Sequence, residues 1–205
     1  MAATTPIDAH ATAETRALLD RLRAAPTGDA AVSDVAAFDV GGIEVLAGHS
    51  LDGVPFPVMS REIRTAHAAG AVITLSWSSV NPLTNGGHGH NAAPLSVASV
   101  LRGGECHEKY VRWLDHLAMF IEQLADAAGR PIPLVLRLFH EHSGDAFWWS
   151  IGGEHPSATA DEYIALWRFT VEYLSGVAGL HNVLYAISAD AHGGYPGDDY
   201  VDLAL

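Results

Sequence analysis

Apolar residues along the chain form two kinds of segment that alternate. Stretches with an apolar residue at every third or fourth position, typical of amphipathic helices, are predicted at 12–25, 58–69, 107–128 and 159–174. Short and almost wholly apolar stretches, typical of buried strands, lie at 35–44, 71–77, 133–139, 182–188 and 201–205. Strands and helices in alternation predict an α/β fold with a parallel sheet.

Turn and cap residues support this division. Gly129 and Pro131 end the longest helical pattern, and Thr159 with Glu162 predicts a capping box at the start of the last helix. The stretch 81–104 is rich in Gly, Asn, Ser and Pro and is predicted as a long, functional loop with at most a short helix. A closed barrel and an open sheet both fit, but no glycine-rich phosphate loop favours the open sheet.

The composition limits the partners of this fold. The 205 residues include 24 acidic and 11 basic ones, a net charge of −13, so nucleic acid and anionic membrane surfaces are not expected partners and a neutral substrate fits better. No run approaches 18 apolar residues, and no secretory signal is visible in this chain. Cys106 is the single cysteine and therefore forms no internal disulfide.

The most informative candidate site follows the apolar strand at 133–139. Glu141 is the candidate general acid/base, because polar residues after the carboxyl ends of barrel strands face the active site. His140 adjoins it, and Arg137 shares its strand parity. Trp148 and Trp149 are either core residues or flat faces for sugar rings. The structural alternative is a solvated loop start, with Arg137 paired to a structural acid.

A second group follows the strand at 71–77. Trp77 could wall a sugar subsite and Asn81 could bind a hydroxyl, against the alternative of a packed tryptophan and an Asn-Pro turn. Histidines at 88, 90, 140 and 142 have no further ligand spacing, so no metal or other cofactor is predicted. The acids between 190 and 202 are predicted to lie in a solvated turn.

Ordered sequence landmarks resemble those of glycoside hydrolase family 26. They run from about residue 35 to the end of the chain: FDVGGIE, LDGVPF, ITLSW with NPLT, LRGGECH, VLRLFHEHSG with FWW, YIALWR, HNVLYAIS and YPGDDYVD. The resemblance implies a (β/α)8 barrel and retaining hydrolysis of internal β-1,4-mannosidic bonds in β-mannan or a related β-glycan. It also implies secretion, and no cofactor.

The resemblance assigns roles to individual positions. It makes Glu141 the acid/base and matches His140, Arg137, Trp148 and Trp149 to family positions; together with Trp77 and Asn81 from the second group, these are the candidate substrate-binding residues. Ser78 stands where the family has a histidine and Ala146 where it has a tryptophan. Retention needs a second carboxylate as nucleophile about 5–5.5 Å away. The family carries it on its seventh strand, which we expect to lie outside these 205 residues.

The expected organisation is therefore one partial barrel. Residues 1–34 are predicted as a helix and linker, and 35–205 as the incomplete catalytic barrel, with no recognisable first strand between Pro26 and Val35. At about 41 residues per unit, eight units would exceed this length. Two alternatives remain open: a non-catalytic glycan-binding remnant of the same fold, and a hydrolase that uses the histidines with a metal.

Overall fold

A computed structural model describes residues 5–24, 34–87, 89–189 and 193–205. Its five parallel strands are β1 (Val35–Asp39), β2 (Val72–Ser76), β3 (Leu134–Arg137), β4 (Val183–Ile187) and β5 (Leu203–Ala204). They lie side by side in sequence order, β1-β2-β3-β4-β5. Consecutive (β/α) barrel units have this order, whereas the order of a doubly wound sheet reverses at its switch point. The predicted parallel α/β architecture is confirmed.

Helices connect these strands close to the predicted positions. They are α1 (Ala13–Ala24), α2 (Phe56–Ala68), α3 (Ser96–Val100), α4 (His107–Glu122), α5 (Ala160–Glu172), the π-helix η1 (Tyr173–Val177) and the 3₁₀-helix η2 (Asp198–Tyr200). The predicted capping box of α5 is present, since Thr159 and Glu162 each bond the other's backbone N–H. In the expected loop at 81–104, the short α3 is the only helix among the residues that the structure describes.

Helix α4 ends six residues before the predicted boundary at 128. The reason is a tight turn in which the Asp126 carboxylate accepts the backbone N–H groups of Ala128 and Arg130, at 2.8 and 2.9 Å. Apolar residues continue through this turn at helical spacing, so the sequence pattern alone placed the end of the helix too late.

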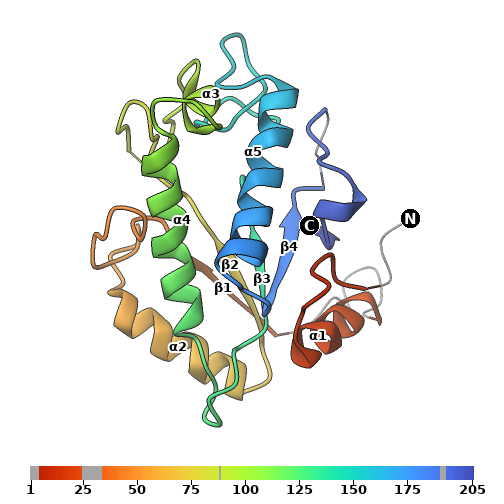
Figure 1. The fold of residues 1–205 in the computed structure, drawn as a ribbon. Helices are drawn as coiled ribbons and strands as arrows, with labels where there is room; N and C mark the ends of the chain where they lie inside the picture. Colours follow the sequence, from red (N-terminus) through yellow and green to blue (C-terminus); the bar gives the residue numbers. More distant parts are fainter. Residues whose placement is uncertain (1–4, 25–33, 88, 190–192) are drawn as a thin grey trace.

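The two faces of the sheet are covered differently. Helices α2, α4 and α5 pack on the outer face, and Figure 1 shows α4 and α5 in front of the strands. Ile73, Leu75, Leu134 and Leu136 point to this side and belong to the main core. Near-continuous apolar strands are expected where both faces of a parallel sheet are covered.

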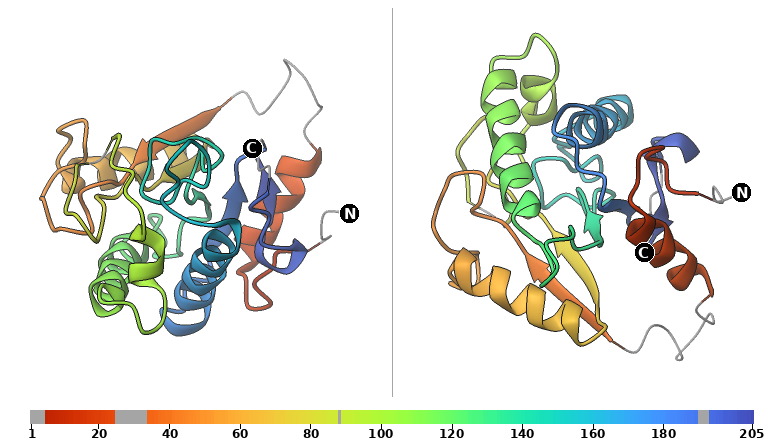
Figure 2. Two further views of the ribbon diagram at one scale, coloured as in Figure 1. Left: turned by 90° about the horizontal axis from the view of Figure 1, so that it is seen from above. Right: turned by 60° about the horizontal axis from the view of Figure 1, so that its bottom comes forward.

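Helix α1 covers part of the inner face. Leu18 and Leu19 pack against Val72, Val135 and Leu184, near the amino ends of the strands. The two further views show α1 beside β4 and β5 and away from α4 (Figure 2). Residues 5–24 therefore close the amino end of the inner face. The division at residue 34 stays a prediction, and the search for a first strand between 26 and 33 falls outside the described residues.

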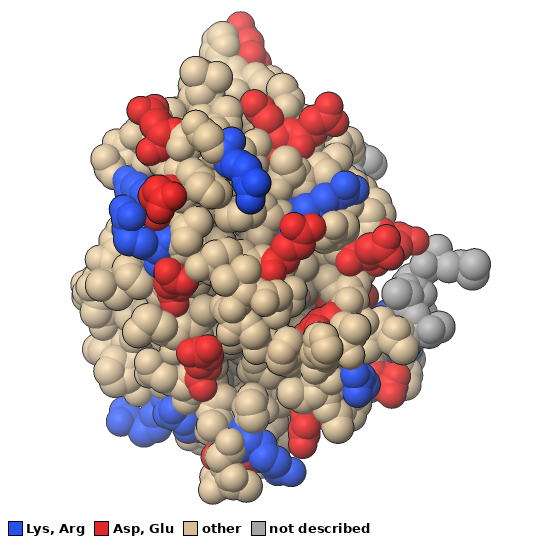
Figure 3. All heavy atoms as spheres, in the orientation of Figure 1, with Lys and Arg blue, Asp and Glu red and all other residues tan. Residues whose placement is uncertain are grey.

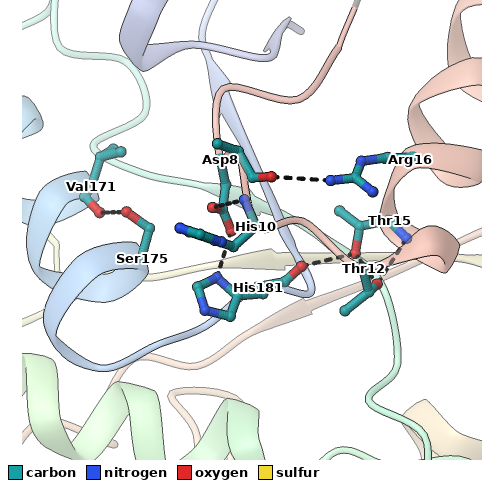
Figure 4. Close-up of polar contacts among 9 residues, drawn as sticks. Asp8, His10, Thr12, Thr15, Arg16, Val171, Ser175 and His181 are labelled. Atoms are coloured by element: carbon teal, nitrogen blue, oxygen red, sulfur yellow. Dashed lines mark hydrogen bonds and ion pairs between the residues drawn. The ribbon is translucent and has the colours of Figure 1, made fainter.

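Polar contacts fasten the segment before α1 to the loop before β4. Asp8 accepts a hydrogen bond from Nδ1 of His181 at 2.8 Å (Figure 4), and Thr12 N–H donates to the carbonyl of His181 at 2.9 Å. Asp202 accepts the N–H groups of Ile7 and Tyr185, both at 2.8 Å. Burial raises the pKa of Asp202 above its usual range. These contacts join the two ends of the described chain.

The surface agrees with the acidic composition. Acidic side chains are spread over the whole face shown in Figure 3, with basic ones between them. Within the described parts of the chain, no helix has the length and apolar character needed to cross a membrane.

Candidate active site

A row of polar residues crosses the carboxyl end of the inner face. Asp39, Ser76 and Arg137 are register neighbours on β1, β2 and β3 and lie on the same inner face as the contacts of α1, at the carboxyl end that α1 does not cover. Oδ2 of Asp39 accepts hydrogen bonds from the hydroxyls of Ser76 and Ser78, at 2.8 and 2.6 Å, and Oδ1 accepts Gly41 N–H at 2.7 Å. The carboxylate of Asp39 is thus held by donors from its own turn, from the end of β2 and from the loop after β2.

The turn after β3 carries the predicted acid. Phe139 and Glu141 both have left-handed backbones, with φ of 43° and 55°, and His140 lies between them. Left-handed residues other than glycine cost about 1–2 kcal/mol each and persist only where surrounding contacts hold them. Glu141 is exposed and His140 is buried. The strained turn therefore presents one carboxyl group to solvent at the carboxyl edge of the sheet.

Hydrogen bonds from distant elements hold this strained turn. Trp149 Nε1 donates to the carbonyl of His140 at 2.9 Å, and the Tyr163 hydroxyl donates to that of Phe139 at 3.3 Å. The N–H of Glu141 donates to Oγ of Ser188 at 3.3 Å. The backbone of the turn is thus fixed from three places: by Trp149 in the aromatic loop 147–149 (the FWW loop), by Tyr163 on α5 and by Ser188 after β4.

Charges near the turn act on His140. Burial lowers its pKa below the usual range, and the nearby Arg137 guanidinium lowers it further, while Asp39 and Glu141 oppose both effects. Its ring packs edge-on against Phe147 and Trp149. His140 is therefore a neutral imidazole at pH 7, one residue from the exposed carboxyl group.

Four predicted substrate-binding residues lie in the interior. Trp77, Trp148, Trp149 and Asn81 are each at most 1% exposed. Trp77 stacks on Tyr110 and donates to Glu44, and Trp148 donates to the hydroxyl of Ser79. No ring face and no amide group of these four residues reaches the surface of the described structure, which favours the alternative of packed core residues; their contact with sugar stays a prediction. His140 adjoins Glu141 in the chain, and Arg137 contacts the same Ser188 hydroxyl as the Glu141 N–H; their role in substrate binding stays a prediction.

Asn81 and Asn91 shape the long loop instead. The side-chain amide of Asn81 donates to the backbone carbonyl of Asn91 and to the hydroxyl of Ser96, both at 2.8 Å. Its side-chain oxygen, Oδ1, accepts the N–H of Leu83. Oδ1 of Asn91 accepts the N–H of Trp148 at 2.8 Å. The loop after β2 is thereby fastened to the FWW loop after β3.

Glu44 is a structural residue that sequence patterns did not single out. Its carboxylate is 1% exposed and accepts three N–H donors, from Gly42, Trp77 and Val80, at 2.9–3.1 Å. It joins the turn after β1 to the loop after β2. The local sequence, a glutamate two residues after a pair of glycines, is a weak signal of a structural role, because the donors that surround Glu44 include residues far along the chain.

The described members of the histidine and acid clusters are not grouped as metal ligands would be. His88 and Asp190 lie outside the described residues. Over the ranges that the structure describes, no three His, Cys, Asp or Glu side chains are grouped to hold a metal ion. In the acidic segment, Asp198 accepts the Tyr195 hydroxyl at 2.7 Å, and Asp202 binds backbone N–H groups.

The arrangement as a whole defines a class of site. Glu141 stands exposed at the carboxyl end of a parallel β/α sheet, with a neutral histidine and an arginine from the same strand region beside it. A carboxylic acid in this position is what general acid/base chemistry at a barrel mouth requires. Glycoside hydrolases use such a carboxyl group to protonate the leaving oxygen.

Comparisons with known proteins specify the family. The glycosyl hydrolase family 26 profile matches residues 56–204. A mannan endo-1,4-beta-mannosidase of Bifidobacterium adolescentis is 32% identical over 96% of this chain. The chain therefore belongs to glycosyl hydrolase family 26.

Solved structures of this family share the fold. A GH26 beta-mannanase from Bacteroides ovatus is 38% identical over 82% of this chain, with a TM-score of 0.75. A modular endo-beta-1,4-mannanase from Cellulomonas fimi is 30% identical over 97% of the chain, with a TM-score of 0.80. The chain covers 50% and 52% of those two structures, and 23% of the Bifidobacterium enzyme. It is thus a partial barrel of the family, as predicted.

Proposed function

We propose that these residues form the acid/base portion of a retaining endo-β-1,4-mannanase site, with β-mannan or a related β-glycan as substrate. The observation that carries the proposal is Glu141, exposed on a strained turn at the carboxyl edge of the sheet. The relatives named above, which are mannanases, support the choice of substrate. Secretion, which the family resemblance implies, stays a prediction.

Each group near Glu141 has a part in this proposal. The Glu141 carboxyl protonates the glycosidic oxygen as the bond breaks, and its carboxylate then removes a proton from the water that attacks the glycosyl-enzyme intermediate. His140 stays neutral, because burial and Arg137 disfavour its protonated form.

The nucleophile belongs to a second carboxylate. Asp39 is occupied by the hydroxyls of Ser76 and Ser78, which suits a structural anchor. In our proposal the nucleophile comes from a later strand, as the family resemblance implies, and the 205 residues alone release little or no sugar from mannan. Burial of Trp77, Trp148 and Trp149 weighs against the alternative of a binding remnant, which depended on these rings as platforms.

The test is hydrolysis assayed with and without an external nucleophile. Reducing-sugar release from galactomannan by the 205-residue chain is expected to be close to background. Sodium formate can take the place of an absent nucleophile, so it should promote cleavage of mannohexaose. Glu141→Gln should abolish the formate-dependent cleavage, and Glu122→Gln, an exposed position on α4, should leave it intact.

Two outcomes would contradict the proposal in different ways. Strong formate-independent hydrolysis that Glu141→Gln abolishes would show that the nucleophile lies within this chain. Formate-dependent cleavage that survives Glu141→Gln would remove Glu141 from its role. Absence of both cleavage and saturable mannohexaose binding, followed by tryptophan fluorescence, would remove the mannan assignment for these residues.

A further inference from the structure

The residue after β4, Ser188, occupies a junction at the proposed site. Its side chain is 3% exposed. Oγ of Ser188 accepts a hydrogen bond from Nη2 of Arg137 at 3.2 Å and another from the backbone N–H of Glu141 at 3.3 Å. A single oxygen from the neighbouring strand thus contacts both the guanidinium at the end of β3 and the peptide that carries the acid.

The position of Ser188 follows from the sheet. Arg137 and Ala186 are register partners on β3 and β4, and Ser188 follows Ala186 by two residues. Alternate residues of a strand point to the same face, so Ser188 lies on the inner face, one step beyond Arg137 toward the carboxyl edge. The backbone geometry therefore brings this hydroxyl to the base of the strained turn.

Among the residues that hold the turn, Ser188 differs from the others in what it joins. Trp149 and Tyr163 donate to the carbonyls of His140 and Phe139 and fix only the backbone. Ser188 accepts from the backbone of Glu141 and also from a charged side chain. Nε of Arg137 is buried and has no hydrogen-bond partner among the described residues, so the contact with Ser188 matters for where this guanidinium lies.

We propose that Ser188 is a positioning residue for the acid/base, which couples the placement of the Arg137 guanidinium to the left-handed backbone of Glu141. This inference rests on the proposed function of Glu141. Without the hydroxyl, the N–H of Glu141 loses its acceptor and the guanidinium loses its anchor at the same time. The turn can then relax toward a less strained backbone, which moves the carboxyl group out of line.

The test uses the 205-residue chain and nuclear magnetic resonance, so it needs no catalytic activity. Ser188→Ala should speed hydrogen exchange of the Glu141 amide by about tenfold relative to the amides of β3 and β4, the effect of losing one hydrogen bond. It should also raise the pKa of His140, because the Arg137 charge that lowers it is no longer fixed nearby. Ser188→Thr keeps the oxygen and should restore both values.

A control separates positioning from general loss of stability. Ser99→Ala removes another buried hydroxyl, which donates to the carbonyl of Ser96 away from the turn, and should leave the Glu141 amide and the His140 titration unchanged. If Ser188→Ala speeds all amides equally, or leaves both readouts as in the wild type, the proposal is wrong. Mannohexaose binding is measured separately, so failure of the substrate assignment is distinguishable from failure of this one.

Discussion

The two ends of the inner face of the sheet are built for opposite purposes. At the amino end, α1 seals an apolar layer of Leu18, Leu19, Val72 and Val135. At the carboxyl end, polar side chains replace this layer, and two strained residues present an exposed carboxyl group. In barrels, the amino face serves stability and the carboxyl face serves chemistry. The same division is present in this partial barrel, with the helix α1 as the seal.

The largest expected effect tests the apolar seal. Leu19 is fully buried between α1 and the sheet. Leu19→Ala should lower the free energy of unfolding in urea by about 2–5 kcal/mol, because it leaves a cavity in a packed layer. Asp20→Ala, at the next and exposed position of the helix, is the matched control.

If the two ends are independent, Leu19→Ala should not move the resonances of the turn after β3 in the folded state. A loss of less than about 1 kcal/mol would mean that α1 is not a true part of the core.

A smaller change of opposite sign is expected at the carboxyl end. Glu141→Gly removes the side chain from a backbone with φ of 55°, which glycine adopts without steric cost. Relief of the strain outweighs the extra chain entropy of glycine, so we expect stability to rise by about 0.5–1 kcal/mol while the proposed acid is lost. Glu154→Gly, at an exposed position outside the left-handed set, should instead destabilise the chain. If both variants lowered the free energy of unfolding equally, the backbone of Glu141 would not be strained.

The polar contacts that join the segment before α1 to the loop before β4 should contribute less to the free energy of unfolding than the apolar layer under α1. Asp8→Asn weakens the contact with His181, whose side chain is 36% exposed. Solvent reaches the His181 side of this pair, although the Asp8 side chain is 5% exposed, so the expected loss is about 0.5–1 kcal/mol in urea unfolding. Thr5→Ala, at an exposed position of the same segment, is the control and should change little. If Asp8→Asn lowered the free energy of unfolding as much as Leu19→Ala, the polar contacts rather than the apolar layer would hold α1 on the sheet.

The smallest effect is a dependence on pH. Since burial and Arg137 lower the pKa of His140 in the folded state, the unfolded chain binds more protons below the ordinary pKa of about 6.5. Stability should therefore fall as the pH drops from about 6.5, and His140→Asn should flatten this slope, measured as thermal midpoints between pH 7 and 5. His155→Asn, an exposed position, is the control. An unchanged slope in His140→Asn would contradict the buried neutral ring.

What the sequence could predict depended on the range of the interactions. Strand and helix order follows from local periodicity, and the acid after β3 follows from its place behind an apolar strand, so both were accessible. The burial of Trp149 was not, because it results from packing against Phe139 and from a bond to His140. An aromatic run has the same pattern whether it faces a core or a ligand.

Ser188 was missed for a related reason. It belongs to no motif, and its importance comes from pairing with β3 across the sheet, at a separation of 47 residues from Glu141. Strand parity places Ser188 on the same face as Arg137 once the pairing of β4 with β3 and its register are known. A single sequence does not give this pairing, and the structure shows it.

The sealing of the inner face by α1 also has a consequence for the order in which the chain can fold during its synthesis. The contact between Ile7 and Asp202 joins residues 195 positions apart. At ribosomal rates of 5–20 residues per second, Ile7 waits roughly 10–40 s for its partner to be made. The apolar face of α1 lacks its packing partners in the nascent chain until β3 and β4 have emerged, so α1 joins the core late in synthesis although it is made first.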